Sequence, residues 1–215
     1  MIAAGGLNNH DFSGMLLKFV KEDAQKVLNG LEAIAYVTGA ARKILYLPEE
    51  ETELAESLKK EIESQGLAIE VENDIVNARL LRDGITCHVE TLAAVADAVE
   101  GKYQAQTLVS VVRYTDSETA EEAKAPACVP FGTSVKELVG DLEGVKAVQV
   151  GEVLYLPEEV EDLVLTAELA LCDGVIRVYT EGCCLLDTAV KKLLASRKKS
   201  CGKCTFCREG LLQLY

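Results

Sequence analysis

The first third of the chain alternates between helical and extended patterns, and this alternation restricts the fold more than any other feature. Apolar residues recur at helical spacing from Val20 to Ala35, and Gly39 follows where a helix would end. Residues 43–47 (KILYL) form an apolar run typical of a buried strand, and residues 67–72 alternate between apolar and polar. Strand–helix–strand segments of this length indicate parallel strands covered by helices, so we predict an α/β fold.

The helix between these two strands begins near Pro48, because a proline and a cluster of glutamates suit the positive end of a helix. Its apolar stripe consists of Leu54, Leu58 and Ile62. Residues 89–99 predict a further helix. Residues 1–14 are rich in glycine and asparagine, and we interpret them as a loop.

The second half of the chain begins with the pattern of a small mixed α/β module. Residues 107–113 (TLVSVVR) predict a strand, and residues 128–130 a short extended segment. Residues 145–150 and 152–156 predict two more strands joined at a glycine.

The C-terminal segment is predicted to contain a helix at residues 158–171, a strand at 175–179 and a helix at 185–196. The last helix has an apolar face that we expect to be buried: Leu185, Leu186, Ala189, Val190, Leu193 and Leu194. Its C-terminal end leads directly into a loop rich in cysteine.

The charge distribution excludes several classes of partner. The chain has 22 Lys and Arg against 35 Asp and Glu, a net charge of −13. Residues 191–208 contain seven basic residues and no acidic one, so the remainder of the chain carries a net charge of −20. An acidic body repels nucleic acid and anionic membranes. No apolar run reaches the length of a membrane span and no secretory signal is visible, so we expect a cytoplasmic protein.

The cysteine-rich loop is residues 200–210 (SCGKCTFCREG), one of the few places where the sequence specifies chemistry. Without a secretory signal, the eight cysteines are expected in a reducing compartment as metal ligands or buried thiols. Cys201, Cys204 and Cys207 have the Cys-x-x-Cys-x-x-Cys spacing of ligands to a [4Fe–4S] cluster. Basic neighbours favour thiolates and offset the cluster charge. A zinc site and three unligated thiols are the alternatives.

The fourth ligand of such a cluster is not identified by the sequence, because no cysteine follows Cys207. This arrangement favours a chain that is part of a longer one. The other cysteines are interpreted as buried small residues, any of which could instead fold back as the ligand: Cys87, Cys128, Cys172, Cys183 and Cys184.

At this loop the sequence resembles the NADH-binding FMN and iron–sulfur flavoprotein subunit of respiratory complex I, and its relatives in NAD-linked hydrogenases and formate dehydrogenases. Residues 129–139 (VPFGTSVKELV) are similar to the centre of that family's ubiquitin-like, soluble-ligand-binding β-grasp (SLBB) module. Residues 26–46 and 89–92 resemble parts of its Rossmann-like domain, and residues 182–195 its helix before the cluster loop. The similarity covers roughly residues 14–210.

The resemblance implies three segments. Residues 1–105 would be a Rossmann-like remnant of the flavin and NADH domain, residues 106–157 the β-grasp module, and residues 158–215 a helix–strand–helix segment that begins a helical iron–sulfur domain. In that family NADH passes a hydride to FMN, and electrons leave one at a time through the cluster. Of the family's functional residues, the three cysteines of the loop carry over to this sequence.

The family's flavin and nucleotide motifs do not carry over. Its Gly-rich phosphate loop would precede residue 1, and Leu7–Gly14 (LNNHDFSG) replaces its Asn-Ala-Asp-Glu-Gly segment. Its Cys-Gly-Glu-Glu-Thr motif is absent between Val71 and Gly84, and Cys87 and His88 stand in place of an Asn pair. Nothing then offsets the charge of a phosphate. We expect neither FMN nor NAD in this chain alone, so the resemblance to an NADH dehydrogenase does not by itself make the chain an enzyme.

The sequence leads to three functional hypotheses. The first is an electron-transfer subunit or domain with a [4Fe–4S] loop and a degenerate flavin site, whose partners are ferredoxin-like, hydrogenase or dehydrogenase subunits of a redox complex. The second is a non-catalytic structural subunit that holds redox partners. The third is an NADH-oxidising flavoprotein whose flavin site another polypeptide completes.

Overall fold

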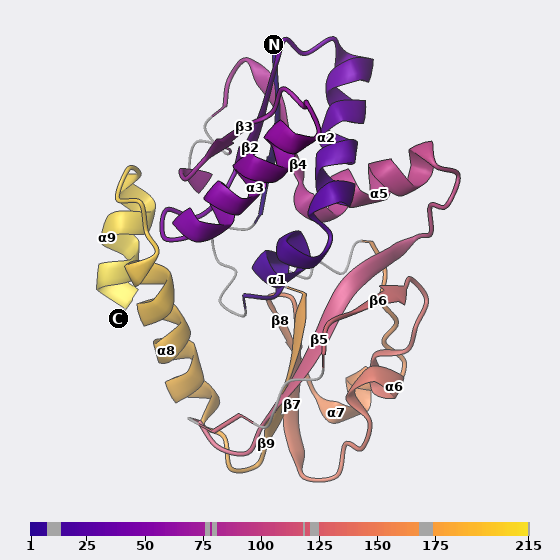
Figure 1. Cartoon of the computed structure of the whole chain (residues 1–215). Helices are drawn as coiled ribbons and strands as arrows, with labels where there is room; N and C mark the ends of the chain where they lie inside the picture. The colour runs from indigo at the N-terminus through magenta and orange to yellow at the C-terminus, as the bar shows by residue number, and fades with distance from the viewer. Residues whose placement is uncertain are drawn as a thin grey trace. The chain divides into compact units, whose positions relative to one another are not determined.

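The computed structural model describes residues 1–7, 14–75, 78, 81–117, 119–120, 125–167 and 174–214 (Figure 1). The chain divides into two compact units, Met1–Gln104 and Ala105–Tyr215. Both units combine helices with a β-sheet, as the predicted α/β class requires. Within the described ranges, no helix has both the length and the apolar character needed to cross a membrane.

The first unit is built on a parallel sheet with the strand order β3-β2-β1-β4. Its strands are β1 (Ile2–Gly6), β2 (Arg42–Tyr46), β3 (Glu70–Glu72) and β4 (Gly84–His88). Its long helices are α1 (Met15–Glu22), α2 (Ala24–Thr38), α3 (Thr52–Ser64) and α5 (Val89–Val99). The strands and helices predicted for this half of the chain are present. Strand β3 covers Glu70–Glu72 and is shorter than the strand predicted for residues 67–72.

Strand β1 corrects the interpretation of residues 1–14 as a loop. It lies between β2 and β4 and pairs in parallel with both, so it is an interior strand of the sheet. Its glycines permit close packing: a Cβ atom on Gly5 would lie 2.6 Å from Leu92 Cδ1 of α5. On the other face, a Cβ atom on Gly6 would lie 3.3 Å from the Cβ of Ala78. The glycines that suggested a loop are therefore explained by tertiary packing.

Helices α1 and α2 correct the prediction of one helix over residues 20–35. The helices are separated at Asp23, which has φ −121° and ψ 32°. Its carbonyl oxygen accepts hydrogen bonds from the backbone N–H groups of Lys26 and Val27, so α2 starts anew there. Aspartate is among the residues that favour helix starts, and this was the available sequence signal for the break.

The second unit contains a mixed five-stranded sheet with the order β6-β5-β9-β7-β8. Its strands are β5 (Gln106–Tyr114), β6 (Ala127–Pro130), β7 (Val145–Val150), β8 (Val153–Tyr155) and β9 (Val175–Thr180). The central β5–β9 pair is parallel, and the other pairs are antiparallel. Strand β9, which we expected to accompany the C-terminal segment, therefore lies inside this sheet.

Four helices accompany this sheet: α6 (Val135–Val139), α7 (Pro157–Val160), α8 (Leu185–Lys198) and α9 (Thr205–Leu214). The core beneath α6 and α7 consists largely of valine from the strands and includes Val148, Val160, Leu165, Ile176 and Val178. β-Branched residues of this kind suit a pleated, buried surface.

The helix predicted for residues 158–171 ends after one turn. Beyond α7 the chain is extended, and residues 168–171 lie outside the described ranges. The backbone N–H of Leu165 donates to Thr133 O at 2.9 Å, and that of Val135 donates to Leu163 O at 2.9 Å. Pairing with the segment before α6 buries Leu165 and satisfies the backbone, so it replaces a second helical turn.

Helix α8 forms as predicted, but the burial predicted for its apolar face is wrong. None of its side chains is buried, and Leu186 is 75% exposed. The main element packed against α8 is α9, which also buries none of its side chains. The spacing of apolar residues correctly predicts an amphipathic helix. It does not indicate whether other elements of the protein pack against the apolar face.

A substitution at the contact between α2 and α5 tests the packing of the first unit. A Cβ atom on Gly30 would lie 1.9 Å from Leu92 O, so Gly30→Ala must push the helices apart. We expect it to lower the free energy of unfolding by about 2–3 kcal/mol. The measurement is urea denaturation followed by circular dichroism.

The matched control is Gly210→Ala in α9, where an added Cβ atom meets nothing within 4 Å. Because alanine has the higher helix propensity, this change should be neutral or stabilising by up to about 1 kcal/mol. Equal unfolding curves for Gly30→Ala and the parent would contradict the close contact of α2 and α5.

Candidate metal centre

The three predicted ligands lie where α8 ends and α9 begins (Figure 1). Gly202 makes the turn between them with φ +68°, and an added Cβ atom would meet nothing within 4 Å. Other residues rarely adopt this conformation, so the glycine is needed for the backbone and not for space. The turn is held by two hydrogen bonds: Gly202 N–H donates to Ser200 Oγ at 3.3 Å, and Arg208 donates to Gly202 O at 3.2 Å.

The three thiols are accessible. Cys201 and Cys204 are exposed in the turn, and Cys207 is half-buried in the first turn of α9. Cys207 Sγ lies 3.3 Å from Ser200 Oγ. In the described part of the chain, no three His, Cys, Asp or Glu side chains converge closely enough to hold a metal ion. The structure thus places the three thiols on one short loop without gathering their sulfur atoms at one point.

The donor set of this loop fits three corners of a [4Fe–4S] cluster. Three thiols within seven residues, a glycine turn and basic neighbours are the chemistry that such a cluster uses. Because Cys201 and Cys204 are exposed, their side chains are not fixed by packing and can turn toward a common centre.

The cysteines at the opposite end of α8 cannot complete the site. Cys183 and Cys184 precede the 14-residue helix, whose length separates them from Cys201 by about 21 Å. Cys183 is 1% exposed, and its Sγ donates to Tyr114 O at 3.2 Å. Cys183 is therefore a buried structural thiol, as predicted. The same prediction is wrong for Cys128 and Cys184, which are exposed, whereas Cys87 is half-buried and Cys172 lies outside the described ranges.

The edge of the first sheet where a nucleotide would bind is the carboxyl end of β1 and β4. In an open parallel sheet, ligands bind where the strand order reverses, and here this point lies between these two strands. Cys87 and His88, which replace the family's Asn pair, lie at the end of β4. Leu7 follows β1 at this edge, but residues 8–13 of the segment Leu7–Gly14 lie outside the described ranges.

The N-terminus of α5 at this edge is capped by the chain itself. His88 is the N-cap residue, and its Nδ1 atom accepts a hydrogen bond from the Glu90 N–H at 3.4 Å. The Glu90 carboxylate lies 3.6 Å from the same Nδ1 atom. A negative charge in the first helical turn occupies the position that favours a phosphate, so this helix start opposes an anionic ligand. Beside it, burial raises the pKa of the Cys87 thiol.

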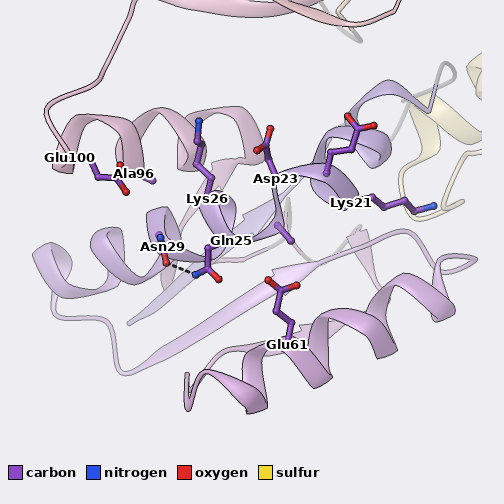
Figure 2. Close-up of a pocket in the computed structure, with 10 residues that line it drawn as sticks. Lys21, Asp23, Gln25, Lys26, Asn29, Glu61, Ala96 and Glu100 are labelled. Atoms are coloured by element: carbon purple, nitrogen blue, oxygen red, sulfur yellow. Dashed lines mark hydrogen bonds between the residues drawn. The ribbon is translucent and has the colours of Figure 1, made fainter.

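A surface pocket of about 390 Å³ lies at the break between α1 and α2 (Figure 2). Its wall carries four carboxylates from Glu22, Asp23, Glu61 and Glu100 and two ammonium groups from Lys21 and Lys26. The ammonium group of Lys26 lies 3.1 Å from a carboxylate oxygen of Asp97. The excess of carboxylates disfavours a phosphate-bearing nucleotide in this pocket. Sequence analysis did not find the pocket, because it depends on the helix break at Asp23.

Comparison with solved structures indicates the fold of the chain. No family model matches the chain. It is similar to a chain of the NAD⁺-reducing [NiFe]-hydrogenase in the air-oxidised state, with a TM-score of 0.71 and 18% identity over 99% of this chain. The H₂-reduced state of an NAD⁺-reducing [NiFe]-hydrogenase gives a TM-score of 0.66 and 19% identity over 98%. In both cases the match covers 46% of the hydrogenase chain, so this chain spans less than half of its length.

The fold class follows from this likeness: the chain has the α/β fold of part of an NAD⁺-reducing hydrogenase chain. At identities of 18% and 19% the likeness concerns the fold. The chemistry of the site must be argued from the residues of this chain.

Thiol labelling of cluster-free protein tests the positions of the cysteines. The exposed thiols of Cys128, Cys184, Cys201 and Cys204 should react with iodoacetamide first, whereas Cys183 should stay unmodified in the folded protein because it is buried. Cys87 has a raised pKa, so less of it is thiolate near pH 8, and its labelling should accelerate only at higher pH. Peptide mass spectrometry gives each rate, and labelling in denaturant is the control. Equal rates for Cys183 and Cys204 in the folded protein would contradict the structure.

Proposed function

We propose that the chain is an electron-transfer subunit or domain of a redox complex of the NADH dehydrogenase and NAD-linked hydrogenase type. The observation that carries this proposal is the loop with three accessible thiols, Cys201, Cys204 and Cys207, on a glycine turn. These residues would hold three irons of a [4Fe–4S] cluster, which when bound stores and releases one electron at a time. The fold shared with part of an NAD⁺-reducing hydrogenase chain supports this assignment.

The two sheets support the more specific resemblance to the complex I flavoprotein subunit. The order β3-β2-β1-β4 with parallel pairing is that of one half of a Rossmann-like sheet. In the order β6-β5-β9-β7-β8, the strands that come first and last in the sequence, β5 and β9, pair in parallel at the centre of the sheet. A ubiquitin-like β-grasp module has the same central pair. We propose that residues 106–157 form most of this module and that β9 adds its final strand.

We further propose that this chain by itself holds neither FMN nor NAD. Two observations support this part of the proposal. The N-terminus of α5 is capped by His88 and carries Glu90, and the pocket at Asp23 has four carboxylates in its wall against two ammonium groups. Both features oppose a phosphate group. The chain would then relay electrons to and from partner subunits without taking a hydride itself.

The fourth cluster ligand is proposed to reach the loop from the solvent side. Cys201 and Cys204 face solvent, so a cysteine of another segment or of a partner subunit has access to the remaining iron. The cysteines at the start of α8 are too distant to serve.

A non-catalytic structural subunit is the second candidate. It is favoured by the apolar edge strand β8 and the residue that follows it, where Val153 is 51% exposed, Leu154 50% and Leu156 52%. An exposed apolar edge of a sheet is suited to pairing with another chain. Such a subunit would hold partners without binding iron.

Iron analysis separates these two candidates. After anaerobic reconstitution with a small thiol to occupy the fourth position, the parent should hold about four irons and four acid-labile sulfides per chain. Cys204→Ala should lose nearly all of both, because it leaves two loop thiols, while circular dichroism stays unchanged. The matched control, Cys184→Ala, removes an exposed cysteine at the other end of α8 and should hold as much iron as the parent. Equal iron in Cys204→Ala and the parent would reject the assigned ligands.

A further inference from the structure

We infer that the cysteine loop lies within a docking surface for an acidic protein that carries one electron at a time. The inference rests on the proposed function and specifies the partner of the same site. We call this region the basic surface and define it by three cations, Arg197, Lys198 and Lys203, with Phe206 beside them. All four side chains are exposed, as are the thiols of Cys201 and Cys204.

The cations of the basic surface are available to a partner. Other basic residues of this region are engaged within the chain: Lys191 pairs with Asp187 at 2.8 Å and Lys192 with Glu152 at 2.8 Å. Arg197, Lys198 and Lys203, in contrast, form no ion pair with any residue in the described ranges. No acidic residue occurs between Asp187 and Glu209, and Glu209 is paired with Arg208 at 2.7 Å.

Phe206 supplies an exposed apolar anchor next to the cysteine loop. It lies between Cys204 and Cys207 in the first turn of α9, and it is 93% exposed. An aromatic side chain this exposed gains free energy when a partner covers it, and aromatic anchors surrounded by charges are typical of binding hot spots. Because Phe206 lies in the sequence between two of the proposed ligands, a partner that covers it comes close to the proposed cluster.

The charge of the whole chain selects an acidic partner. Outside residues 191–208 the net charge is −20, so an acidic protein is repelled from the rest of the chain and attracted here. A nucleic acid would be attracted by the same cations, but its long anionic backbone would meet the repulsive body. A compact acidic protein can be attracted by these cations without extending along the acidic body. In the transfer itself the reduced cluster loses one electron, the oxidised centre of the partner gains it, and no bond forms or breaks.

Binding measurements on the full, reconstituted chain test the inference. The probe is a plant-type [2Fe–2S] ferredoxin as the acidic carrier, with cytochrome c as the basic carrier. We expect the parent to bind the ferredoxin and not cytochrome c, with an affinity that falls as salt is raised. Lys198→Glu/Lys203→Glu should weaken binding about tenfold or more at low salt and less at high salt. Phe206→Ser should weaken it by a similar factor at both salt concentrations.

Matched variants make these results specific. Lys59→Glu/Lys60→Glu changes the net charge equally on exposed residues of α3, and Tyr36→Ser removes an aromatic residue that is 89% exposed on α2. Both should bind the ferredoxin as the parent does. Iron and sulfide are measured in every variant, so loss of the cluster is distinguished from loss of docking.

Three results would overturn the inference. If Lys198→Glu/Lys203→Glu and Phe206→Ser keep their iron and bind ferredoxin as tightly as the parent, the docking surface is wrong while the proposed electron-transfer function stands. If the parent holds no iron after reconstitution, both the proposed function and the docking inference fail. If a single-stranded DNA oligonucleotide competes with the ferredoxin for the parent at physiological salt, the cations serve nucleic acid.

Discussion

The parallel pairing of β5 and β9 fixes the start of helix α8 and, through that helix, the position of the cysteine loop. The pair runs from Ser110–Val175 to Tyr114–Tyr179, so both strands end at the same edge. Beyond this edge, Cys184 N–H donates to Ser117 Oγ at 2.9 Å and Lys191 Nζ donates to Ser117 O at 3.0 Å. These contacts tie the first half of α8 to the loop after β5. The position of the thiols beyond the C-terminal end of α8 is therefore set by a continuous helix.

A close backbone contact shows how tightly this junction is built. A Cβ atom on Gly182 would lie 2.4 Å from Thr115 O, so only glycine allows the turn from β9 into α8 to pass there. Thr180 Oγ1 donates to the same carbonyl oxygen at 3.0 Å, and the buried thiol of Cys183 donates to Tyr114 O. Sequence spacing alone would allow Cys183 to be a metal ligand. Cys183 instead stabilises the junction between β9 and α8, although it directly precedes the helix that leads to the proposed ligands.

What the sequence could predict follows from the range over which each signal acts. The helices α3, α5 and α8 and the strands β2, β5 and β7 were predicted because periodicity and strand propensity are local. The cysteine spacing is also a local signal, and the metal ligands that it predicts stay a prediction. Strand β1 was missed because its two glycines are explained only by Leu92 and Ala78, which are distant in sequence. The exposure of α8 was missed because an apolar stripe does not reveal what covers it.

The charged groups of the two units differ in the ligands that they favour. The start of α5 in the first unit disfavours a phosphate, whereas the cysteine loop of the second unit is exposed to a partner. At the first sheet, the helix start that could hold a phosphate is capped by His88 and carries the charge of Glu90. At the end of α8, exposed thiols lie near Arg197, Lys198 and Lys203, which form no ion pair within the described ranges. A protein that took a hydride would need the first site open, because a dinucleotide brings two phosphates. A protein that relays single electrons needs only the second site at its surface. The arrangement of charge therefore agrees with the proposed relay of single electrons and disfavours a dinucleotide at the first sheet.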